Sequence, residues 1–318
     1  MAKDVMLIKT SSLGDVIHAL PVISDLRAVA AVDRIDWVVE ASFATIPRLH
    51  SGVTNVIPVA IRNWRRGWRR HEVRDDITTC LRQLRGRSYD AIVDAQGLLK
   101  SAVVALAVRG TRYGFDFRSA REPISIFYHH TFRISWDLHA VERNRLLMAR
   151  AVGYEVPLHC DYGIRSAARE FSWLPEKPYA VLLHATSGDY KLWPEQHWIA
   201  LAAVLGSAGI SCVLPWGSVV ERERSARLAS HMRSACVPPA LSLADVPGLF
   251  AGSRLVVGVD TGLTHMAAAL GVPTVGIYCA TDPAATGLYG CARALNLGGP
   301  GLVPEWAQVM SAIEKLDI

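Results

Sequence analysis

The sequence lacks the patterns that mark several large classes of protein. Its six cysteines form no CxxC pair and no regular framework, which excludes a disulfide-stapled domain and indicates reduced thiols in a cytosolic protein. No HExxH pattern occurs, and neither His71-Glu72 nor His129-His130 has partners at the spacing of metal ligands. We therefore expect no metal site.

Two phosphate-binding signatures are missing as well. Neither the GxGxxG fingerprint of dinucleotide-binding folds nor the GxxxxGK[ST] loop of P-loop proteins occurs. The usual sequence evidence for a nicotinamide-dependent enzyme or a P-loop enzyme is therefore missing.

Long apolar runs are scarce. One uncharged stretch, residues 199–216, is long enough to raise the question of a membrane span, but Gly206, Gly209 and Pro215 interrupt it. These residues favour a helix, a turn and a buried strand over a continuous span. The first apolar run of the chain is cut short by Lys9, so we expect no signal peptide and a soluble protein.

What the sequence does contain is a regular alternation of short apolar strands and longer helical patterns. Its 318 residues are 51% hydrophobic and 20% charged, which excludes a disordered chain and suggests two domains. Runs typical of buried parallel strands fall at 5–8, 35–39, 56–59, 91–93, 179–184, 211–214, 255–259 and 274–278. Helical patterns fall between them at 16–29, 98–108, 195–205, 220–232 and 264–270.

This alternation predicts an α/β protein with two doubly wound, Rossmann-like domains, each built on a parallel sheet. We place the first domain at residues 1–170 and the second at 176–300. A last helix within 303–318 has an apolar stripe that must pack somewhere. We expect it to cross back to the first domain.

Positive charge is concentrated in one short segment. Residues 62–74 hold six arginines and one acid, which account for the whole net charge of +5. On a single helix, five of the arginines would cover one half of the surface, while Trp64 and Trp68 would pack into the domain. Such a patch suits phosphate and carboxylate groups. Nucleic acid is a competing partner without a supporting motif, and an anionic lipid or membrane surface fits equally well.

Ligands of parallel sheets bind outside the carboxyl ends of the strands, and the loop at residues 9–15 lies at such an end. It places Asp15 near the start of a helix, whose positive end keeps a carboxylate ionised. An ionised carboxylate can accept a proton from an attacking hydroxyl group. The alternative is that Asp15 only caps the helix.

Three loops of the second domain carry further candidates. Thr186, Ser187 and Lys191 offer hydroxyl groups and a positive charge to a phosphate, or else form an ordinary exposed turn. Asp260 and His265 flank the start of a helix whose amides would face an anion. The alternatives are that Asp260 is an N-cap and that His265 is a buried imidazole of the core.

The third of these loops contains Glu221. An acid in this position can bind ribose hydroxyl groups, although a glutamate in the first turn of a helix is the commoner case. Together the three loops suit a nucleotide diphosphate better than any one of them does. A lysine with helix amides can also neutralise a departing diphosphate without a metal.

The chain resembles the ADP-heptose:lipopolysaccharide heptosyltransferase family along nearly its whole length, and its type I branch most. Several separate motifs occur in the family's order: KTSSLGDVIHALP, VIPVAIRNWRR, YDAIVDAQGLLKSA, LLHATSGDYKLWPEQHW and VVGVDTGLTHMAAALG. The resemblance implies a GT-B fold with the acceptor domain first and the ADP-sugar domain second.

The resemblance also implies an activity. It is the transfer of L-glycero-D-manno-heptose, with inversion, from ADP-heptose to the inner Kdo of Kdo2-lipid A in lipopolysaccharide inner-core biosynthesis. We expect no cofactor besides the substrate nucleotide and no nucleic-acid partner. We further expect a monomer that lies peripherally on the cytoplasmic face of the inner membrane.

Carried onto this sequence, the resemblance makes Asp15 the general base. It assigns the ADP-sugar to Thr186, Ser187, Lys191, Glu221, Leu241, Asp260, Thr261, Gly262 and His265. It assigns the anionic groups of the acceptor to Arg62, Arg65, Arg66, Arg69 and Arg121. Three other functions stay open: a type II heptosyltransferase that needs a heptosylated acceptor, a nucleotide-sugar epimerase of similar architecture, and a non-catalytic protein that binds anionic lipid.

Overall fold

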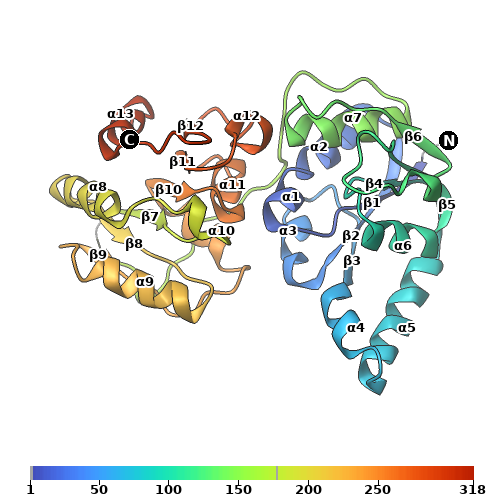
Figure 1. Ribbon diagram of the computed structural model, residues 1–318, viewed down its shortest axis with the longest axis horizontal. Coiled ribbons are helices and arrows are strands. Elements are labelled where there is room, and N and C mark those ends of the chain that lie inside the picture. Colours follow the sequence, from blue (N-terminus) through green and yellow to red (C-terminus); the bar gives the residue numbers. More distant parts are fainter. Residues whose placement is uncertain (1–2, 177) are drawn as a thin grey trace. The chain divides into compact units, whose positions relative to one another are not determined.

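The computed structural model describes residues 3–176 and 178–318. The chain divides into two compact units, Met1–Ile164 and Arg165–Ile318 (Figure 1). The division falls earlier than the end we expected for the first domain, residue 170, because the segment after Ile164 packs on the second unit. Arg169 forms an ion pair with Asp245, and Cys236 Sγ lies 3.5 Å from the carbonyl oxygen of Trp173.

The first unit is built on a six-stranded parallel sheet in the order β3-β2-β1-β4-β5-β6. In the register of its centre, Leu7 lies opposite both Trp37 and Val93. The central strands are apolar on both faces because helices cover both sides of the sheet. The strands are β1 (Lys3–Ile8), β2 (Val32–Glu40), β3 (Asn55–Val59), β4 (Ser88–Asp94), β5 (Arg109–Phe115) and β6 (His130–Phe132).

The helices of this unit form one layer on each face of the sheet. On one face, α5 (His71–Arg85) and α6 (Leu99–Ala107) share a hydrophobic cluster with the sheet. On the other, α2 (Leu20–Val29) packs against α7 (Ala140–Val152). The single helix expected at 16–29 is two helices, α1 (Leu13–Ile17) and α2, since Pro21 cannot donate the backbone hydrogen bond that a continuous helix needs.

The arginine-rich segment is a helical hairpin and not the single helix that we expected. Helix α4 (Ile61–Gly67) ends before a turn, and α5 then runs back toward the sheet (Figure 1). Trp64 packs against the hydrophobic cluster and donates from Nε1 to Asp76 Oδ2 at 2.5 Å. Trp68 lies in the turn with 58% of its surface exposed, so the expectation that it packs into the domain is wrong.

The second unit repeats the plan with a six-stranded parallel sheet in the order β12-β11-β10-β7-β8-β9. Its core contains Trp193 and Trp198, whose rings meet edge to face at 4.9 Å. The strands are β7 (Tyr179–Leu183), β8 (Ser211–Val213), β9 (Ala235–Cys236), β10 (Leu255–Val259), β11 (Thr274–Tyr278) and β12 (Ala294–Gly298). The helices are α8 (Glu195–Ser207), α9 (Val219–Ala229), α10 (Val246–Ala251), α11 (Gly262–Ala269), α12 (Pro283–Thr286) and α13 (Trp306–Lys315).

The last helix, α13, packs on the second unit. Val309, Ala312 and Ile313 join the core cluster that contains Trp198 and Leu205 of α8. The expectation that this helix crosses back to the first domain is therefore wrong. The chain arrives from β12 on the same sheet, and the side of α8 already offers the apolar surface that the stripe requires.

None of the helices in the described part of the chain is both long and apolar enough to cross a membrane. The uncharged stretch at 199–216 contains the end of α8, a turn at Gly209 with φ of 77°, and strand β8. A left-handed residue in such a turn favours glycine.

Candidate active site

Asp15 lies at the carboxyl end of β1, in the first turn of the short helix α1. Its Oδ2 accepts a hydrogen bond from the backbone N–H of Ser12 at 3.0 Å. Asp15 thus does cap its helix, as the alternative interpretation held. Its other oxygen, Oδ1, faces a pocket, and 17% of the side chain is exposed.

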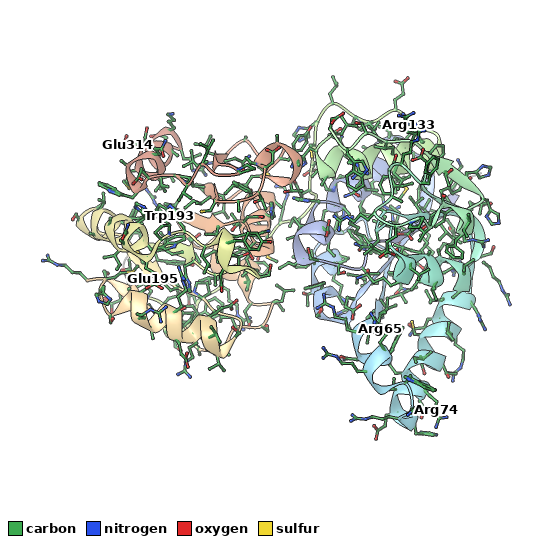
Figure 2. All side chains as sticks on the ribbon, viewed as in Figure 1. Arg65, Arg74, Arg133, Trp193, Glu195 and Glu314 are labelled. Atoms are coloured by element: carbon green, nitrogen blue, oxygen red, sulfur yellow. The ribbon has the colours of Figure 1, made fainter. Side chains whose placement is uncertain are left out.

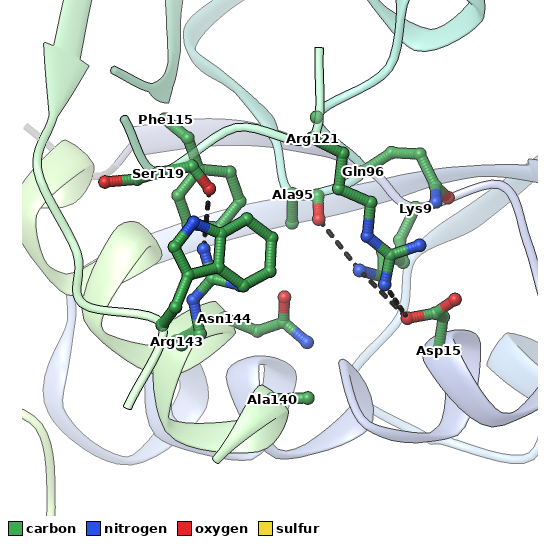
Figure 3. A pocket seen from close by; sticks show the side chains of 12 residues that line it. Lys9, Asp15, Ala95, Gln96, Phe115, Ser119, Arg121, Ala140, Arg143 and Asn144 are labelled. Atoms are coloured by element: carbon green, nitrogen blue, oxygen red, sulfur yellow. Dashed lines mark hydrogen bonds and ion pairs between the residues drawn. The ribbon is translucent and has the colours of Figure 1, made fainter. Parts of the chain in front are cut away.

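Two positive charges meet Asp15 Oδ1 (Figure 3). Lys9 Nζ lies 3.7 Å away and Arg121 Nη2 lies 3.4 Å away. Burial by itself would raise the pKa of the Asp15 carboxyl, but Lys9, then Arg121 and the hydrogen bonds from Ser12 hold that pKa below its ordinary value. Asp15 is therefore ionised at neutral pH, with Lys9 and Arg121 as the main favourable charges.

Lys9 is a functional candidate that the sequence reasoning missed. It is 5% exposed, and its Nζ donates to the carbonyl oxygen of Ala95 at 2.8 Å. Burial lowers the pKa of this lysine, and the charge of Asp15 opposes that effect. A lysine at the end of an otherwise apolar strand was the available signal, because a buried ammonium group needs a partner.

Side chains from the loop after β4 and from α6 form hydrogen bonds with the loop that carries Asp15. Gln96 Oε1 accepts hydrogen bonds from the backbone N–H groups of Thr10 and Ser11, each at 2.9 Å. Lys100 Nζ donates to Ser11 Oγ at 2.5 Å. The sequence reasoning also missed Gln96 and Lys100, whose partners come from a neighbouring strand and lie far away along the chain.

A pocket beside Asp15 is lined largely by positive and polar groups (Figure 3). The Arg143 guanidinium stacks on Trp136 at 3.4 Å from the ring centroid and donates to the carbonyl oxygen of Ser119 at 2.6 Å. Burial lowers the pKa of Arg143 to about 10, so it is charged at neutral pH. The pocket suits an anionic ligand that presents a hydroxyl group to Asp15.

The structure separates the predicted acceptor arginines. Arg121 reaches Asp15, as described above. Arg62 lies near Lys100. Burial is the main cause of the lowered pKa of this lysine; the charge of Glu40 raises that pKa, and the charge of Arg62 lowers it. Arg65, Arg66 and Arg69 are exposed on the α4–α5 hairpin, from which Arg65 projects in Figure 2.

In the second unit the candidate residues converge on Asp260, directly after β10. Lys191 Nζ lies 2.7 Å from Asp260 Oδ2, Thr281 Oγ1 donates to the same oxygen at 2.8 Å, and His265 Nε2 lies 3.6 Å from Oδ1. Burial opposes ionisation, but the hydrogen bonds from His265, Lys191 and Thr281 hold the pKa of Asp260 well below its usual range. Asp260 is not the N-cap of α11, a position that Thr261 occupies.

The loop at 186–191 is tied to this cluster. Thr186 Oγ1 donates to the backbone oxygen of Asp260 at 2.8 Å, while Ser187 is exposed. Helix α11 begins at Gly262 beside them, and the first backbone N–H groups of a helix have no carbonyl partner in the preceding turn. The sequence reasoning missed Thr281, which follows the neighbouring strand β11 as Asp260 follows β10.

Glu221 and Leu241 lie farther along the same edge of the sheet. Glu221 is in the first turn of α9, and its Oε2 accepts from the backbone N–H of Gly217 at 2.6 Å. The structure thus places Glu221 in the first turn of a helix, as the alternative interpretation held, and Ser218 is the N-cap. Leu241 is half-buried in the stretch between β9 and α10. In the described residues no group of three or more His, Cys, Asp or Glu side chains could hold a metal ion.

Comparison with known proteins gives a consistent result over most of the chain. The profile of glycosyltransferase family 9 (heptosyltransferase) matches residues 77–299. The lipopolysaccharide heptosyltransferase 1 of Escherichia coli K12 is 44% identical, over 90% of this chain and 91% of the relative. The enzyme of that name from Pseudomonas aeruginosa is 46% identical, over 90% of this chain and 81% of the relative.

Solved structures resemble this chain over nearly its whole length. The E. coli heptosyltransferase WaaC with ADP has a TM-score of 0.89 at 41% identity, covering 98% of this chain and 99% of the other. E. coli ADP-heptose lps heptosyltransferase II has a TM-score of 0.78 at 20% identity, covering 98% of each chain. The second likeness concerns the fold alone, which is a GT-B-like α/β fold.

Proposed function

The chain belongs to glycosyltransferase family 9, the heptosyltransferases, and we propose that it acts as an inverting lipopolysaccharide heptosyltransferase. It transfers L-glycero-D-manno-heptose from ADP-heptose to the inner Kdo of Kdo2-lipid A in inner-core biosynthesis. The observation that carries the reaction is the ionised Asp15 carboxylate, held between Lys9 and Arg121 in a positively charged pocket. The family relatives named above support this choice of substrates.

The second unit binds the donor. Lys191, Thr186 and Ser187 hold the diphosphate of ADP-heptose together with the backbone N–H groups at the start of α11, where Thr261 and Gly262 lie. Asp260 fixes Lys191 at 2.7 Å and so directs its ammonium group, while His265 and Thr281 fix Asp260. Glu221 binds the ribose and Leu241 lies against the adenine. The solved structure of E. coli heptosyltransferase WaaC with ADP-2-deoxy-2-fluoro heptose, at 40% identity and a TM-score of 0.85, supports ADP-heptose as the donor.

The first unit binds the acceptor. The carboxylates of Kdo and the phosphates of lipid A are anions, and Arg121, Arg62 and the arginines of the hairpin are their partners. Arg143 adds a positive charge to the pocket that Arg121 and Asp15 line. This charge pattern favours an anionic sugar over a neutral one.

The reaction is a single displacement. Asp15 Oδ1 takes the proton of the Kdo hydroxyl group while that oxygen forms a bond to the anomeric carbon of heptose. The bond from that carbon to the diphosphate breaks on the opposite face, and ADP leaves with the electron pair. Lys191 and the amides of α11 neutralise the charge that develops on ADP. The residues described here supply every charge that the step requires.

The substitution Asp15→Asn tests this proposal. We expect transfer to fall by a factor of about a thousand or more, because the amide cannot accept the proton. The affinity for ADP should stay within about twofold, since the ADP-binding residues are in the other unit. The mass of Kdo2-lipid A after incubation with ADP-heptose measures transfer, and calorimetry measures ADP binding.

Asp4→Asn is the matched control, since Asp4 is an acid of the same unit, on β1, at the far end of that strand from Asp15. Near-normal transfer by Asp15→Asn, or an equal loss of ADP binding and transfer, would contradict the role of Asp15. Transfer to a heptosylated acceptor alone would identify a type II activity. Consumption of the donor without any acceptor would favour an epimerase.

We infer that the protein works as a monomer on the cytoplasmic face of the inner membrane, where a lipid-anchored acceptor is accessible. The exposed arginines of the hairpin support this location, because anionic lipid attracts clustered basic residues. ADP-heptose and Kdo2-lipid A are then its substrates, and no other cofactor is required.

A further inference from the structure

Helix α6 exposes an apolar stripe. Leu99, Val103 and Leu106 are 52%, 57% and 45% exposed, and their spacing of four and three residues places them on one helical face. The opposite face is already used, since Ala102 and Ala105 are buried in the hydrophobic cluster of the first unit. The helix contains no acidic residue, and Lys100 is its single charge. A surface helix of an ordinary soluble domain has a polar outer face.

A further exposed apolar side chain lies on the same face of the sheet as this stripe. The short 3₁₀ helix η2 (Ser125–Phe127) packs into the same hydrophobic cluster as α6, and Ile126 within it is 83% exposed. The neighbouring helix α5, in contrast, carries charged residues on its outer face. These residues are Glu72, Arg74, Asp75, Asp76, Arg82 and Arg85.

Positive charge lies on the same face of the sheet as the stripe, on the other arm of the hairpin that α5 forms with α4. Helix α5 contacts both α4 and α6, so the hairpin lies beside α6 on the same face of the sheet (Figure 1). Arg65, Arg66 and Arg69 are exposed on this hairpin, and the Arg69 guanidinium lies over the exposed Trp68 ring at 5.0 Å. An exposed tryptophan with arginines is typical of the boundary between lipid headgroups and acyl chains.

We propose that this docking surface, formed by the α6 stripe with Ile126, Trp68 and the hairpin arginines, binds an anionic lipid bilayer. The apolar side chains enter the headgroup region, and the guanidinium groups pair with lipid phosphates. A bilayer offers both an apolar interior to the stripe and anionic headgroups to the arginines, whereas the α6 stripe of a second copy offers only apolar side chains and Lys100. Charge complementarity therefore selects the bilayer.

The surface also lies where a bilayer would help the reaction. Lys100, one residue after the start of the stripe, donates to Ser11 in the loop that carries Asp15. A bilayer docked on α6 would hold the headgroup of a lipid-anchored acceptor near that loop. The inference rests on the proposed function for this consequence alone, since lipid binding is measured without any acceptor.

The test uses flotation of the full chain with vesicles of phosphatidylglycerol and phosphatidylcholine that contain no acceptor. The double variant Val103→Glu/Leu106→Glu should reduce the vesicle-bound fraction about tenfold relative to wild type. The matched control is Val29→Glu on α2, on the opposite face of the sheet, where Val29 is 49% exposed; it should bind as wild type does. All three proteins should transfer heptose equally well to a deacylated, water-soluble acceptor.

Several results would overturn the proposal. The double variant could bind vesicles within twofold of wild type, or the Val29→Glu control could lose as much binding as the double variant does. Wild type could bind vesicles of phosphatidylcholine alone equally well, or bind only those vesicles that contain the acceptor. A dimer of wild type that the double variant abolishes would assign the surface to a second copy. If the glutamate variant fails to fold, Val103→Gln/Leu106→Gln takes its place. Lack of transfer to every acceptor by wild type would contradict the proposed function and leave the vesicle result intact.

Discussion

At the residue scale, the titration of Asp15 depends on a lysine that is itself almost out of reach of water. Lys9 Nζ lies 3.7 Å from Asp15 Oδ1 and is the largest favourable contribution to the lowered pKa of that carboxyl. Lys9→Met keeps the length and volume of the side chain but removes the charge, so the pKa of Asp15 should rise. The acid limb of the pH profile of kcat/KM should then move to higher pH by about one unit.

Lys3→Met is the matched control, because Lys3 begins β1, the strand that Lys9 follows, and donates to the carbonyl oxygen of Val152 instead of pairing with Asp15. Its acid limb should coincide with that of wild type. A Lys9→Met profile that falls in height without moving along the pH axis would mean that the lysine only supports the fold.

The sequence could indicate which residues hold the charges, but not how those charges pair. Asp15, Lys191 and Asp260 were predictable because each follows a strand at the edge where ligands bind. Their partners Lys9 and Thr281 were not, since a partner is set by the register of neighbouring strands and by which side chains are buried together. The ion pair between Lys191 and Asp260, for example, could not be predicted from the positions of the two residues in the sequence.

At the element scale, the α4–α5 hairpin exposes its arginines to solvent. Replacing Arg62, Arg65 and Arg66 with glutamine should raise the KM for a soluble Kdo acceptor by about tenfold or more, because charge-assisted hydrogen bonds to its anions are lost. The KM for ADP-heptose should change by less than about twofold. Kinetics in which each substrate is varied separately measure the two constants.

Arg82 and Arg85, exposed at the other end of α5, provide the matched control. Their replacement by glutamine removes nearby charge without touching the segment assigned to the acceptor. An equal rise in both KM values, or the same effect in the control, would mean that the hairpin arginines act only through general charge.

A buried ion pair joins α2 to α7. Arg145 Nε lies 2.8 Å from Asp25 Oδ2, and the same guanidinium donates to the carbonyl oxygens of Pro157 and His159. Arg145→Met should lower the free energy of unfolding of the first unit by about 3–5 kcal/mol near neutral pH, because Asp25 is left charged and unpaired. Arg150→Met, on an exposed part of α7, should cost less than about 1 kcal/mol.

The pH dependence of this loss has a definite sign. Burial raises the pKa of Asp25 above its ordinary value, and Arg145 opposes that rise. Without Arg145 the pKa rises further, so Asp25 in the folded variant takes up its proton at a higher pH than in wild type. The loss in Arg145→Met should therefore shrink as the pH falls below neutral in denaturant titrations. A loss that grows as the pH falls would contradict this account.

The eight strands that the sequence predicted are short apolar runs, and all of them except the edge strand β3 lie inside their sheets. Strands β1, β4, β7 and β10 lie inside their sheets and read as continuous apolar runs. The missed strands β5, β6, β9 and β12 lie at or next to an edge, where one or both faces meet water. Strand β5, for example, reads Arg-Gly-Thr-Arg-Tyr-Gly-Phe and is buried only at its end, so its pattern is that of a loop.

At the scale of the whole molecule, each unit closes its own core. The bridge between His50 and Ile164 ends the first unit, and α13 completes the core of the second. The sequence predicted two domains from alternation alone, but it could not place α13. An apolar stripe shows that a helix packs against something, but it does not show which surface it packs against. Here the surface is the side of α8, which belongs to the same unit as the strand that precedes α13.

Two separate cores predict two cooperative transitions in thermal unfolding. ADP binds the second unit in our proposal, so a concentration of about 100 times Kd should stabilise that unit by about 2.7 kcal/mol and leave the other transition in place. Arg145→Met should lower the transition of the first unit alone, because both Asp25 and Arg145 belong to it. Differential scanning calorimetry of wild type and variant, each with and without ADP, gives the four traces required. If ADP and Arg145→Met moved the same transition, the two cores would unfold as one, and the assignment of ADP to a separately stabilised unit would be wrong.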